Sequence, residues 1–429
     1  MRKLILWGVV IILIVGTAVA GFLWWRKPQV LTLSDGMKLT LLGVDYGKHH
    51  KAPAVKINGA IRRNLGGGPS SFNTTNDTLV VWILSEHKAN QWPNYQVLAQ
   101  DKAATASAGS WAGGSSQQIK SGMEIRGIQL DAFPRRERKI ILRIMNFGQR
   151  GQQIAKGQFI ISNPVRGAFP QWTAEPLPDT QADGDLNVTL TRLNNVASFN
   201  RGNGVPAKDP VNRAVETVFH TEQNGVVVTN WQPMHIETSD ATGNHIDNSS
   251  WSNGRADNGD ATMTYQWGLW PDEPVWKLRV EMSRTAGFNS DEVWSVTNVP
   301  VNPGSQQDVW NYRNQNHQSR KAAFAETTLN GFHLKIFPAV RFTDQNFGNG
   351  EKPGGFLIQV EPELSNGMRM TLAKITDEQG RDLQSWGPNG GGDYEIYQLP
   401  NLRNAKTLNL TLAVHKSRFV EFTVKPTKP

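Results

Sequence analysis

The chain beyond residue 28 is a succession of short apolar or alternating runs, separated by stretches rich in Gly, Asn, Asp and Pro. In the segment 276–282 every second residue is apolar, and the residues between them, Lys277, Arg279 and Glu281, are charged. A run of this kind forms a strand with one buried and one solvated face. The pattern predicts an all-β chain, with strands at residues 30–33, 39–44, 78–84, 95–98, 124–130, 139–145, 157–161, 186–193, 216–220, 226–229, 234–238, 276–282, 292–296, 332–337, 355–360, 368–375, 394–397, 408–414 and 419–424.

Two connecting stretches, 163–185 and 300–321, divide these strands into three groups. We therefore predict a membrane-proximal basic β domain at 28–165, a Trp-rich middle β-sandwich at 186–300 and a C-terminal β-sandwich at 322–429. About seven strands per roughly 100 residues is what an immunoglobulin-like sandwich requires. The expected fold is thus a tandem array of immunoglobulin-like β-sandwich domains. Because the chain has no cysteine, the disulfide of antibody domains is impossible.

One long apolar run, Leu4–Trp25, precedes these domains, with two basic residues on each side. As a helix it would span roughly 33 Å, enough to cross the hydrocarbon core of a bilayer. We predict that residues 1–27 form a retained transmembrane signal-anchor. Ala18-Val19-Ala20 also fits a signal-peptidase site, and cleavage after Ala20 would give a soluble exported protein. The short head and long tail favour a single-pass protein of the bacterial inner membrane with most of the chain exported.

Charge is distributed unevenly along the chain. Residues 1–170 contain 22 Lys and Arg against 8 Asp and Glu, whereas residues 171–429 contain 23 against 29. A basic domain beside a bilayer is attracted to anionic lipid headgroups, so the expected partners are the bilayer itself, through residues 4–25, and such headgroups. An exported domain has no contact with nucleic acid, and any protein or glycan partner stays unidentified.

The motifs of common enzyme classes are missing from the sequence. It has no Gly-x-Ser-x-Gly elbow, no His-Glu-x-x-His and no Walker A loop. We assign no catalytic residue, no cofactor and no metal site. Adjacent histidines on a strand, such as His49 and His50, point to opposite faces, and the oxygen-rich stretch 240–260 matches no calcium-loop spacing. Glycoside cleavage stays open through carboxylate pairs of unknown separation, namely Asp272 with Glu273 and Glu361 with Glu363.

Tryptophan is the most informative excess, since seven of the fifteen fall between Trp231 and Trp310. Trp251, Trp267 and Trp270 lie in or beside a polar loop. An exposed indole packs against the apolar face of a sugar ring while neighbouring amides bind the hydroxyl groups. These three residues are the candidate ligand-binding residues, and packing inside the sandwich is the alternative interpretation.

The alternating segment 275–280, followed by Glu292-Val-Trp-Ser-Val, resembles a pattern in uncharacterised bacterial membrane-anchored proteins with tandem β-sandwich domains. The segments 372–381 and 419–426 add to the likeness. The resemblance implies localisation and fold, and no activity or site comes with it.

The sequence therefore predicts a non-catalytic, membrane-anchored envelope protein that acts as a binding or scaffolding module. The alternative is a carbohydrate-binding module, or a carbohydrate-active enzyme, that uses the Trp-rich middle domain.

Overall fold

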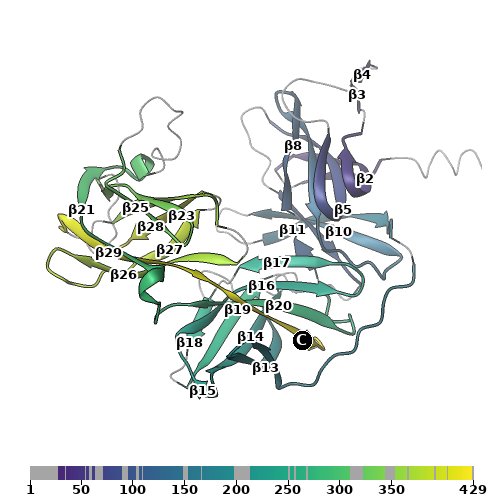
Figure 1. Ribbon diagram of the computed structural model, residues 1–429. Helices are drawn as coiled ribbons and strands as arrows, with labels where there is room; N and C mark the ends of the chain where they lie inside the picture. Colours follow the sequence, from purple (N-terminus) through teal and green to yellow (C-terminus); the bar gives the residue numbers. More distant parts are fainter. Residues whose placement is uncertain are drawn as a thin grey trace, which may run out of the picture.

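The computed structural model confirms an all-β chain built from several sheets, with a β-sandwich-like arrangement (Figure 1). Its described part contains thirty strands, the short 3-10 helix η1 (Ser290–Glu292) and one helical turn at 306–309. The described residues are 28–33, 35–53, 55–57, 60–62, 71–88, 95–102, 106–108, 110–147, 153–165, 167–197, 213–249, 252–255, 258–266, 269–309, 322–343, 353–364, 367–390, 393–402 and 404–427.

The first unit contains a five-stranded sheet in the order β1-β2-β5-β9-β8 and a four-stranded sheet in the order β11-β10-β6-β7. A separate hairpin joins β3 to β4. The bounds are β1 (Val30–Thr32), β2 (Lys38–Lys51), β3 (Val55–Ile57), β4 (Ala60–Arg62), β5 (Ser71–Glu86), β6 (Tyr95–Gln100), β7 (Ala106–Ala108), β8 (Ser110–Lys120), β9 (Met123–Leu130), β10 (Lys139–Phe147) and β11 (Gln153–Ser162).

Strand β5 shows why this unit forms. Its six successive residues from Leu79 to Leu84 are all apolar and all buried, so both faces of the strand are buried. Leu79, Val81 and Ile83 face the main core, to which the four-stranded sheet contributes its own alternate side chains. Val80 and Trp82 face the opposite way into a second, smaller apolar cluster. A central strand with a continuous apolar run is the expected result of burial on both faces.

The middle unit pairs a sheet in the order β12-β13-β14-β19-β18, with β15 beside β14, and a sheet in the order β17-β16-β20-β30. Its last strand comes from the C-terminal end of the chain. The bounds are β12 (Asp179–Asp183), β13 (Leu186–Ala197), β14 (Arg213–Gln223), β15 (Val226–Val227), β16 (Trp231–Asp240), β17 (His245–Ser249), β18 (Ser252–Arg255), β19 (Asp260–Gln266), β20 (Trp276–Arg284) and β30 (Arg418–Val424).

The third unit is one nine-stranded sheet system around its own core, which contains Phe356 stacked on Tyr397. Its strands are antiparallel except for the parallel pair β21–β24. The bounds are β21 (Val293–Gly304), β22 (Ala325–Leu329), β23 (Phe332–Ile336), β24 (Ala339–Phe342), β25 (Gly354–Glu361), β26 (Met368–Asp377), β27 (Trp386–Gly390), β28 (Tyr394–Leu399) and β29 (Thr407–Lys416).

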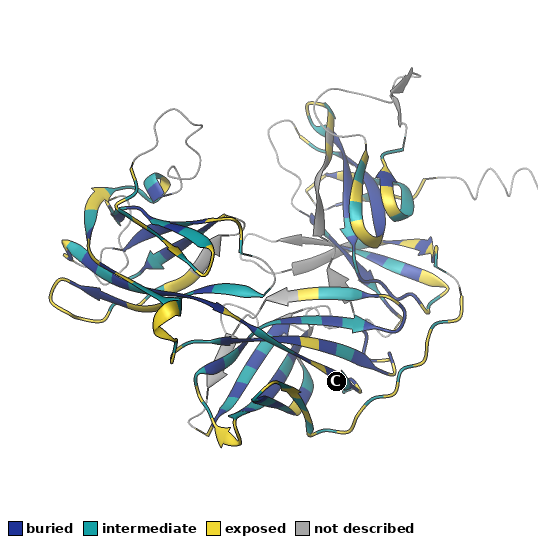
Figure 2. Cartoon of the chain, in the orientation of Figure 1, coloured by how far each residue is buried: buried dark blue, intermediate teal, exposed yellow. Residues whose placement is uncertain are grey.

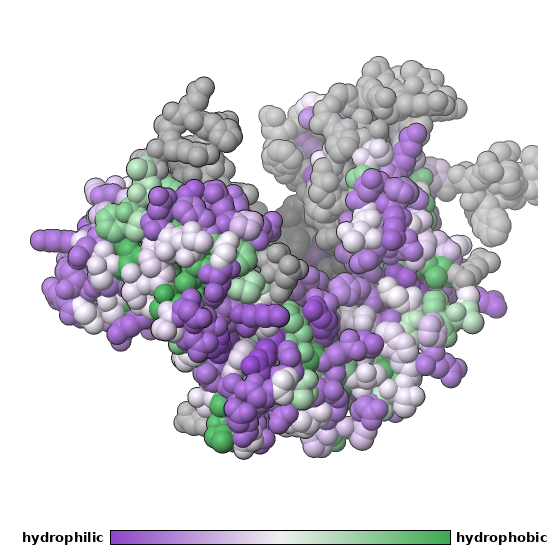
Figure 3. Space-filling view, viewed as in Figure 1, coloured by the Kyte–Doolittle hydropathy of each residue, from purple (hydrophilic) through white to green (hydrophobic). Residues whose placement is uncertain are grey.

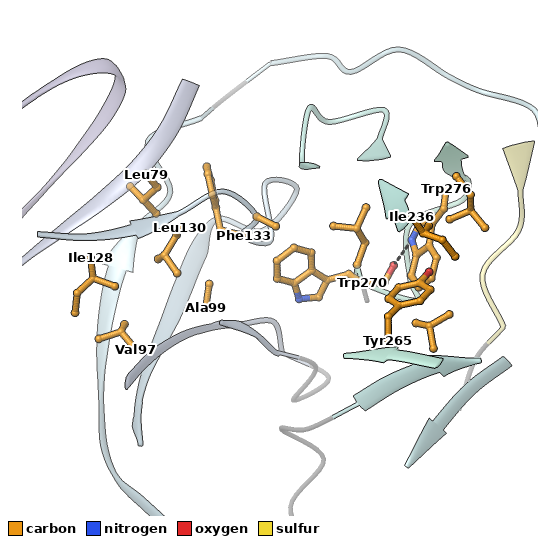
Figure 4. Close-up of a cluster of buried hydrophobic side chains, with 14 of the residues drawn as sticks. Leu79, Val97, Ala99, Ile128, Leu130, Phe133, Ile236, Tyr265, Trp270 and Trp276 are labelled. Carbon is orange, nitrogen blue, oxygen red and sulfur yellow. Dashed lines mark hydrogen bonds between the residues drawn. The ribbon is translucent and has the colours of Figure 1, made fainter. Parts of the chain in front are cut away.

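The cores of the first and middle units are continuous. Buried side chains of both belong to one apolar cluster, and Figure 2 shows buried positions running along the strands of both units. Phe133 of the first unit and Trp270 of the middle unit lie at the contact between them (Figure 4). This contact places polar side chains from two distant segments against each other.

One sequence prediction differs from the structure, and another concerns residues that the structure does not describe. The strands predicted at 39–44 and 78–84 are longer in the structure, because β2 continues through His49 and His50 to Lys51 and β5 begins at Ser71. The expected anchor helix Leu4–Trp25 lies outside the described residues. In the part of the chain that the structure describes, no helix has the length and apolar character needed to cross a bilayer.

Candidate functional site

The turn between β16 and β17 is organised by the buried carboxylate of Asp240. One oxygen accepts hydrogen bonds from the Thr242 amide at 2.8 Å, the Thr242 hydroxyl at 2.6 Å and the Asn244 amide at 3.2 Å. The other oxygen accepts one from the Asn244 side chain at 2.9 Å. Gly243 supplies the positive φ of +90° that the turn requires. These bonds fix the Asn244 side chain in one orientation, with its carbonyl oxygen toward the first unit.

Arg135, from the loop between β9 and β10, meets that oxygen. Its Nε donates to Asn244 Oδ1 at 2.9 Å, and the Phe133 amide donates to the same oxygen at 3.1 Å. Its terminal nitrogens donate to the Tyr46 hydroxyl at 3.1 Å, the Thr242 carbonyl at 3.2 Å and the Asp77 carbonyl at 3.3 Å. Arg135 is only 6% exposed. One buried guanidinium therefore joins three segments of the first unit to the middle unit through neutral acceptors.

A second contact lies beside the first. Arg136 Nε donates to both carboxylate oxygens of Glu273, at 2.9 and 3.1 Å, and its guanidinium lies 5.2 Å from the centre of the Phe169 ring. Burial raises the pKa of the Glu273 carboxyl, and the nearby Asp240 adds to this, although the Arg136 guanidinium opposes both. The pair closes the same junction from the side of the linker that connects the units.

A cavity of about 530 Å³ opens at this junction, and we call it the junction cleft. Trp172 gives it a half-buried aromatic wall, with the Lys277 ammonium 5.2 Å from the ring centre. Asp131, held by a 2.6 Å hydrogen bond from Gln129, and the exposed Asp77 add carboxylates. The full lining consists of Tyr46, Lys48, Asn76, Asp77, Thr78, Asp131, Arg135, Trp172, Ser239, Asp240, Gly243, Asn244 and His245. An indole beside amides and carboxylates is the chemistry that binds a polyhydroxylated ligand.

The structure describes one of the three tryptophans proposed from the sequence. Trp270 is 3% exposed, and its carbonyl accepts a 3.2 Å hydrogen bond from the Trp276 indole (Figure 4). It therefore presents no free ring face for a sugar in this structure. Trp251 and Trp267 lie outside the described residues, so sugar binding through them stays a prediction.

Sequence reasoning missed Trp172. It lies in the stretch 163–185, which we interpreted only as a domain boundary because of its Pro, Gly, Gln and Asp content. A lone tryptophan in such a stretch is a usable signal, since a large aromatic side chain in a polar connector needs a surface to pack against. Arg135 and Asn244 carried no such signal, because their meeting depends on how two units pack.

Two hydroxyl–histidine pairs resemble the pairing of a nucleophile with its general base in an enzyme. His50 Nε2 lies 3.2 Å from Thr78 Oγ1, and His50 Nδ1 lies 3.5 Å from Asp45 Oδ2. Ser283 Oγ lies 3.4 Å from His415 Nε2. Both hydroxyl residues are 2% exposed, so neither oxygen is open to a substrate. Each pair gives a buried hydroxyl group a hydrogen-bond partner, as is usual for polar groups in protein cores.

Among the described residues, no group of three or more His, Asp or Glu side chains is arranged to hold a metal ion. The chain matches none of the known protein-family models, and no curated protein is similar enough in sequence to be a relative.

Proposed function

We propose that this protein is a non-catalytic binding or scaffolding module of the bacterial cell envelope. The expected helix Leu4–Trp25 holds it at the inner membrane as a single-pass protein, and the β units lie on the exported side. The observation that carries the proposal is the construction of the junctions between units, which use buried charged and polar side chains. Such contacts hold neighbouring units in one orientation, as a scaffold requires.

The first junction is the Arg135–Asn244 contact described above. The second joins the middle and third units, where Arg369 donates to both oxygens of Glu281 at 2.6 and 2.5 Å. Glu281 is 7% exposed. Burial disfavours its charge, yet the hydrogen bonds and the positive charge of Arg369 hold the pKa of Glu281 below its ordinary value. A charged pair that stays ionised in a buried place requires both partners to remain in position.

Strand β30 strengthens the same junction. It leaves the third unit directly after β29 and pairs with β20 along its length, from Met282 opposite Arg418 to Trp276 opposite Val424. Arg418 also forms an ion pair with Asp185. The chain therefore crosses between these two units twice, once through 285–292 and once at residue 417. Two crossings restrict relative rotation more than a single linker does.

The finer fold assignment is part of this proposal. We take the predicted domains at 28–165, 186–300 and 322–429 as tandem immunoglobulin-like sandwiches. Their support is the predominance of antiparallel strands in facing sheets. The last strand, β30, lies with the sheet of the middle domain.

Membrane attachment is tested by expressing the full chain with alkaline phosphatase fused to its C-terminus. We expect the fusion to be active, because the enzyme folds only after export, and to remain in the membrane fraction after a carbonate wash. An inactive fusion would overturn the exported orientation. An active fusion released by the wash would show that the helix is cleaved and would contradict anchoring.

Carbohydrate binding is the second candidate function, and the junction cleft is the observation that favours it. Trp172 offers an aromatic wall, and Asp77, Asp131 and Asn76 offer hydrogen-bonding groups within the same cavity. The test is a glycan array probed with the full chain and with Trp172→Ala and Asp131→Asn variants. Retention lost in both variants would support the sugar function. Retention unchanged by either would exclude this cleft.

A further inference from the structure

The segment that follows the expected anchor is fixed to the edge of the first unit. Among the described strands, β11 is the edge strand of its sheet, so one side of its backbone pairs with none of them. The Gln29 side chain occupies that side: its Nε2 donates to the Ile160 carbonyl at 2.7 Å, and the Ile160 amide donates to its Oε1 at 2.9 Å. One amide side chain thus replaces a neighbouring strand.

A second contact holds the same segment. Leu31 packs so closely over Gly157 that a Cβ at Gly157 would lie 3.0 Å from Leu31 Cδ1. Residues 29–31 therefore lie along the edge of β11, although Gln29 and Ile160 are 131 positions apart in the sequence. The point at which the chain enters the first unit is defined by side-chain packing and hydrogen bonds.

This attachment places the β11 edge close to the end of the apolar run. Three residues lie between Trp25 and Gln29, and the four residue steps of a fully extended chain span at most about 14 Å. If the anchor ends at the bilayer interface, Gln29 lies within that distance of the lipid headgroups, and Ile160 lies beside the Gln29 side chain. The inference therefore rests on the anchoring proposed above.

The surface around Ile160 has the composition expected beside anionic lipid. Cross-strand partners share one face of a sheet, and Lys139 pairs with Ser162 while Ile141 pairs with Ile160. Ile160 and Val30 are both 43% exposed, which is unusual for large apolar side chains in this structure. Figure 3 shows apolar and hydrophilic residues mixed over the right-hand part of the view, where Figure 1 draws strands of the first unit.

Positive charge predominates beside these apolar side chains. Arg138 and Lys139 are exposed at the start of β10. The carboxylate of the same loop, Glu137, is paired at 3.3 Å with Lys102, whose side chain is 79% exposed. We call the surface formed by Val30, Ile160, Arg138 and Lys139 the β11 face.

We propose that the β11 face lies on the surface of a bilayer rich in anionic phospholipid, so that the first unit rests on the membrane in one orientation. Exposed Ile160 and Val30 enter the interfacial layer, and Arg138 and Lys139 bind lipid phosphate. Basic side chains next to a membrane span are attracted to anionic headgroups, and this attraction is screened beyond a Debye length of about 8–10 Å, so the proposal requires Arg138 and Lys139 to lie at the headgroups themselves. The first unit then transmits its orientation to the other units through the rigid junctions.

The test uses the absence of cysteine from the chain, which makes single-cysteine labelling specific. The full chain with Ile160→Cys carries an environment-sensitive fluorophore and is placed in nanodiscs of phosphatidylglycerol and phosphatidylcholine that contain spin-labelled quencher lipid. The matched control is Val226→Cys, on the distant β14–β15 hairpin, where the side chain is 64% exposed. We expect several-fold stronger quenching at residue 160 than at residue 226.

Charge dependence gives the second readout. Arg138→Glu with Lys139→Glu, or nanodiscs of phosphatidylcholine alone, should reduce quenching at residue 160 to the level of the control. Lys374→Glu with Lys416→Glu, an equal charge change on the third unit, should leave it unchanged. Equal quenching at residues 160 and 226 in anionic nanodiscs would overturn the β11-face proposal while leaving anchoring intact. A chain that stays out of the nanodiscs would overturn both.

Discussion

Replacing Arg135 with Met tests the first junction most sharply. Methionine keeps an unbranched apolar stem against the Phe133 ring, whose centre lies 4.7 Å from the guanidinium carbon, and against the Tyr46 ring at 5.6 Å. It removes every hydrogen-bond donor of the guanidinium. The substitution therefore separates the loss of hydrogen bonds and charge from the loss of packing.

The expected cost follows from the acceptors that are left behind. Arg135→Met deprives the Thr242 and Asp77 carbonyls and the Tyr46 hydroxyl of a donor, whereas Asn244 Oδ1 keeps the Phe133 amide. A hydrogen bond to a charged group contributes about 1.5–3 kcal/mol, and bonds from one group are not additive. We expect a loss of about 3 kcal/mol, which corresponds to roughly a hundredfold change in the local opening equilibrium.

Amide hydrogen exchange measures this opening directly, which matters because a chain of several units does not unfold in one step. The Phe133 and Asn244 amides should exchange about a hundredfold faster in Arg135→Met. The control is Arg192→Met, which breaks a 3.0 Å ion pair between Arg192 and Glu216. The Arg192 side chain is 55% exposed, so its loss should cost less than about 1 kcal/mol. Equal exchange rates at the junction in both variants would refute the role assigned to Arg135.

Two further predictions concern the third unit. Burial raises the pKa of Glu395 to about 7, although its carboxylate accepts a 2.6 Å hydrogen bond from Tyr397. The folded state thus binds this proton more tightly than the unfolded state, so the stability of the unit falls as the pH rises from about 4.5 to 7. Glu395→Gln should flatten that part of a plot of urea midpoint against pH. A wild-type and variant profile of equal slope would contradict this. Gly354→Ala should destabilise by about 2 kcal/mol, because a Cβ there would lie 2.2 Å from Leu402 Cδ2, whereas Gly387→Ala, with no atom within 4 Å, should be close to neutral in the same thermal melts.

The sequence predicted the strands well because alternation reports which residues are buried. Each expected run has a counterpart, and the alternating segment 276–282 became β20 with Trp276, Leu278 and Val280 fully buried. Alternation does not identify the partner strand. Nothing in the run Phe419–Val424 indicates that it pairs with β20, more than a hundred residues earlier in the chain, and not within the third unit.

The candidate site was less accessible to sequence reasoning. Tryptophan excess directed attention to Trp270, but burial at the contact between two units depends on tertiary packing, which no local pattern encodes. Trp172 was overlooked because its neighbours are typical of a linker. The Asp240–Asn244 turn was recognisable as a turn, since Asp and Gly occur where a positive φ is needed, yet its partner Arg135 was not.

A distance measurement across the units tests the central claim of a rigid scaffold most directly. Spin labels at Ile160→Cys in the first unit and Trp386→Cys in the third, both exposed positions, report the separation through both junctions. Pulsed electron spin resonance on the full chain should give one narrow distance distribution, and Arg135→Met should broaden it. A broad distribution in the otherwise unmodified chain would contradict the scaffold.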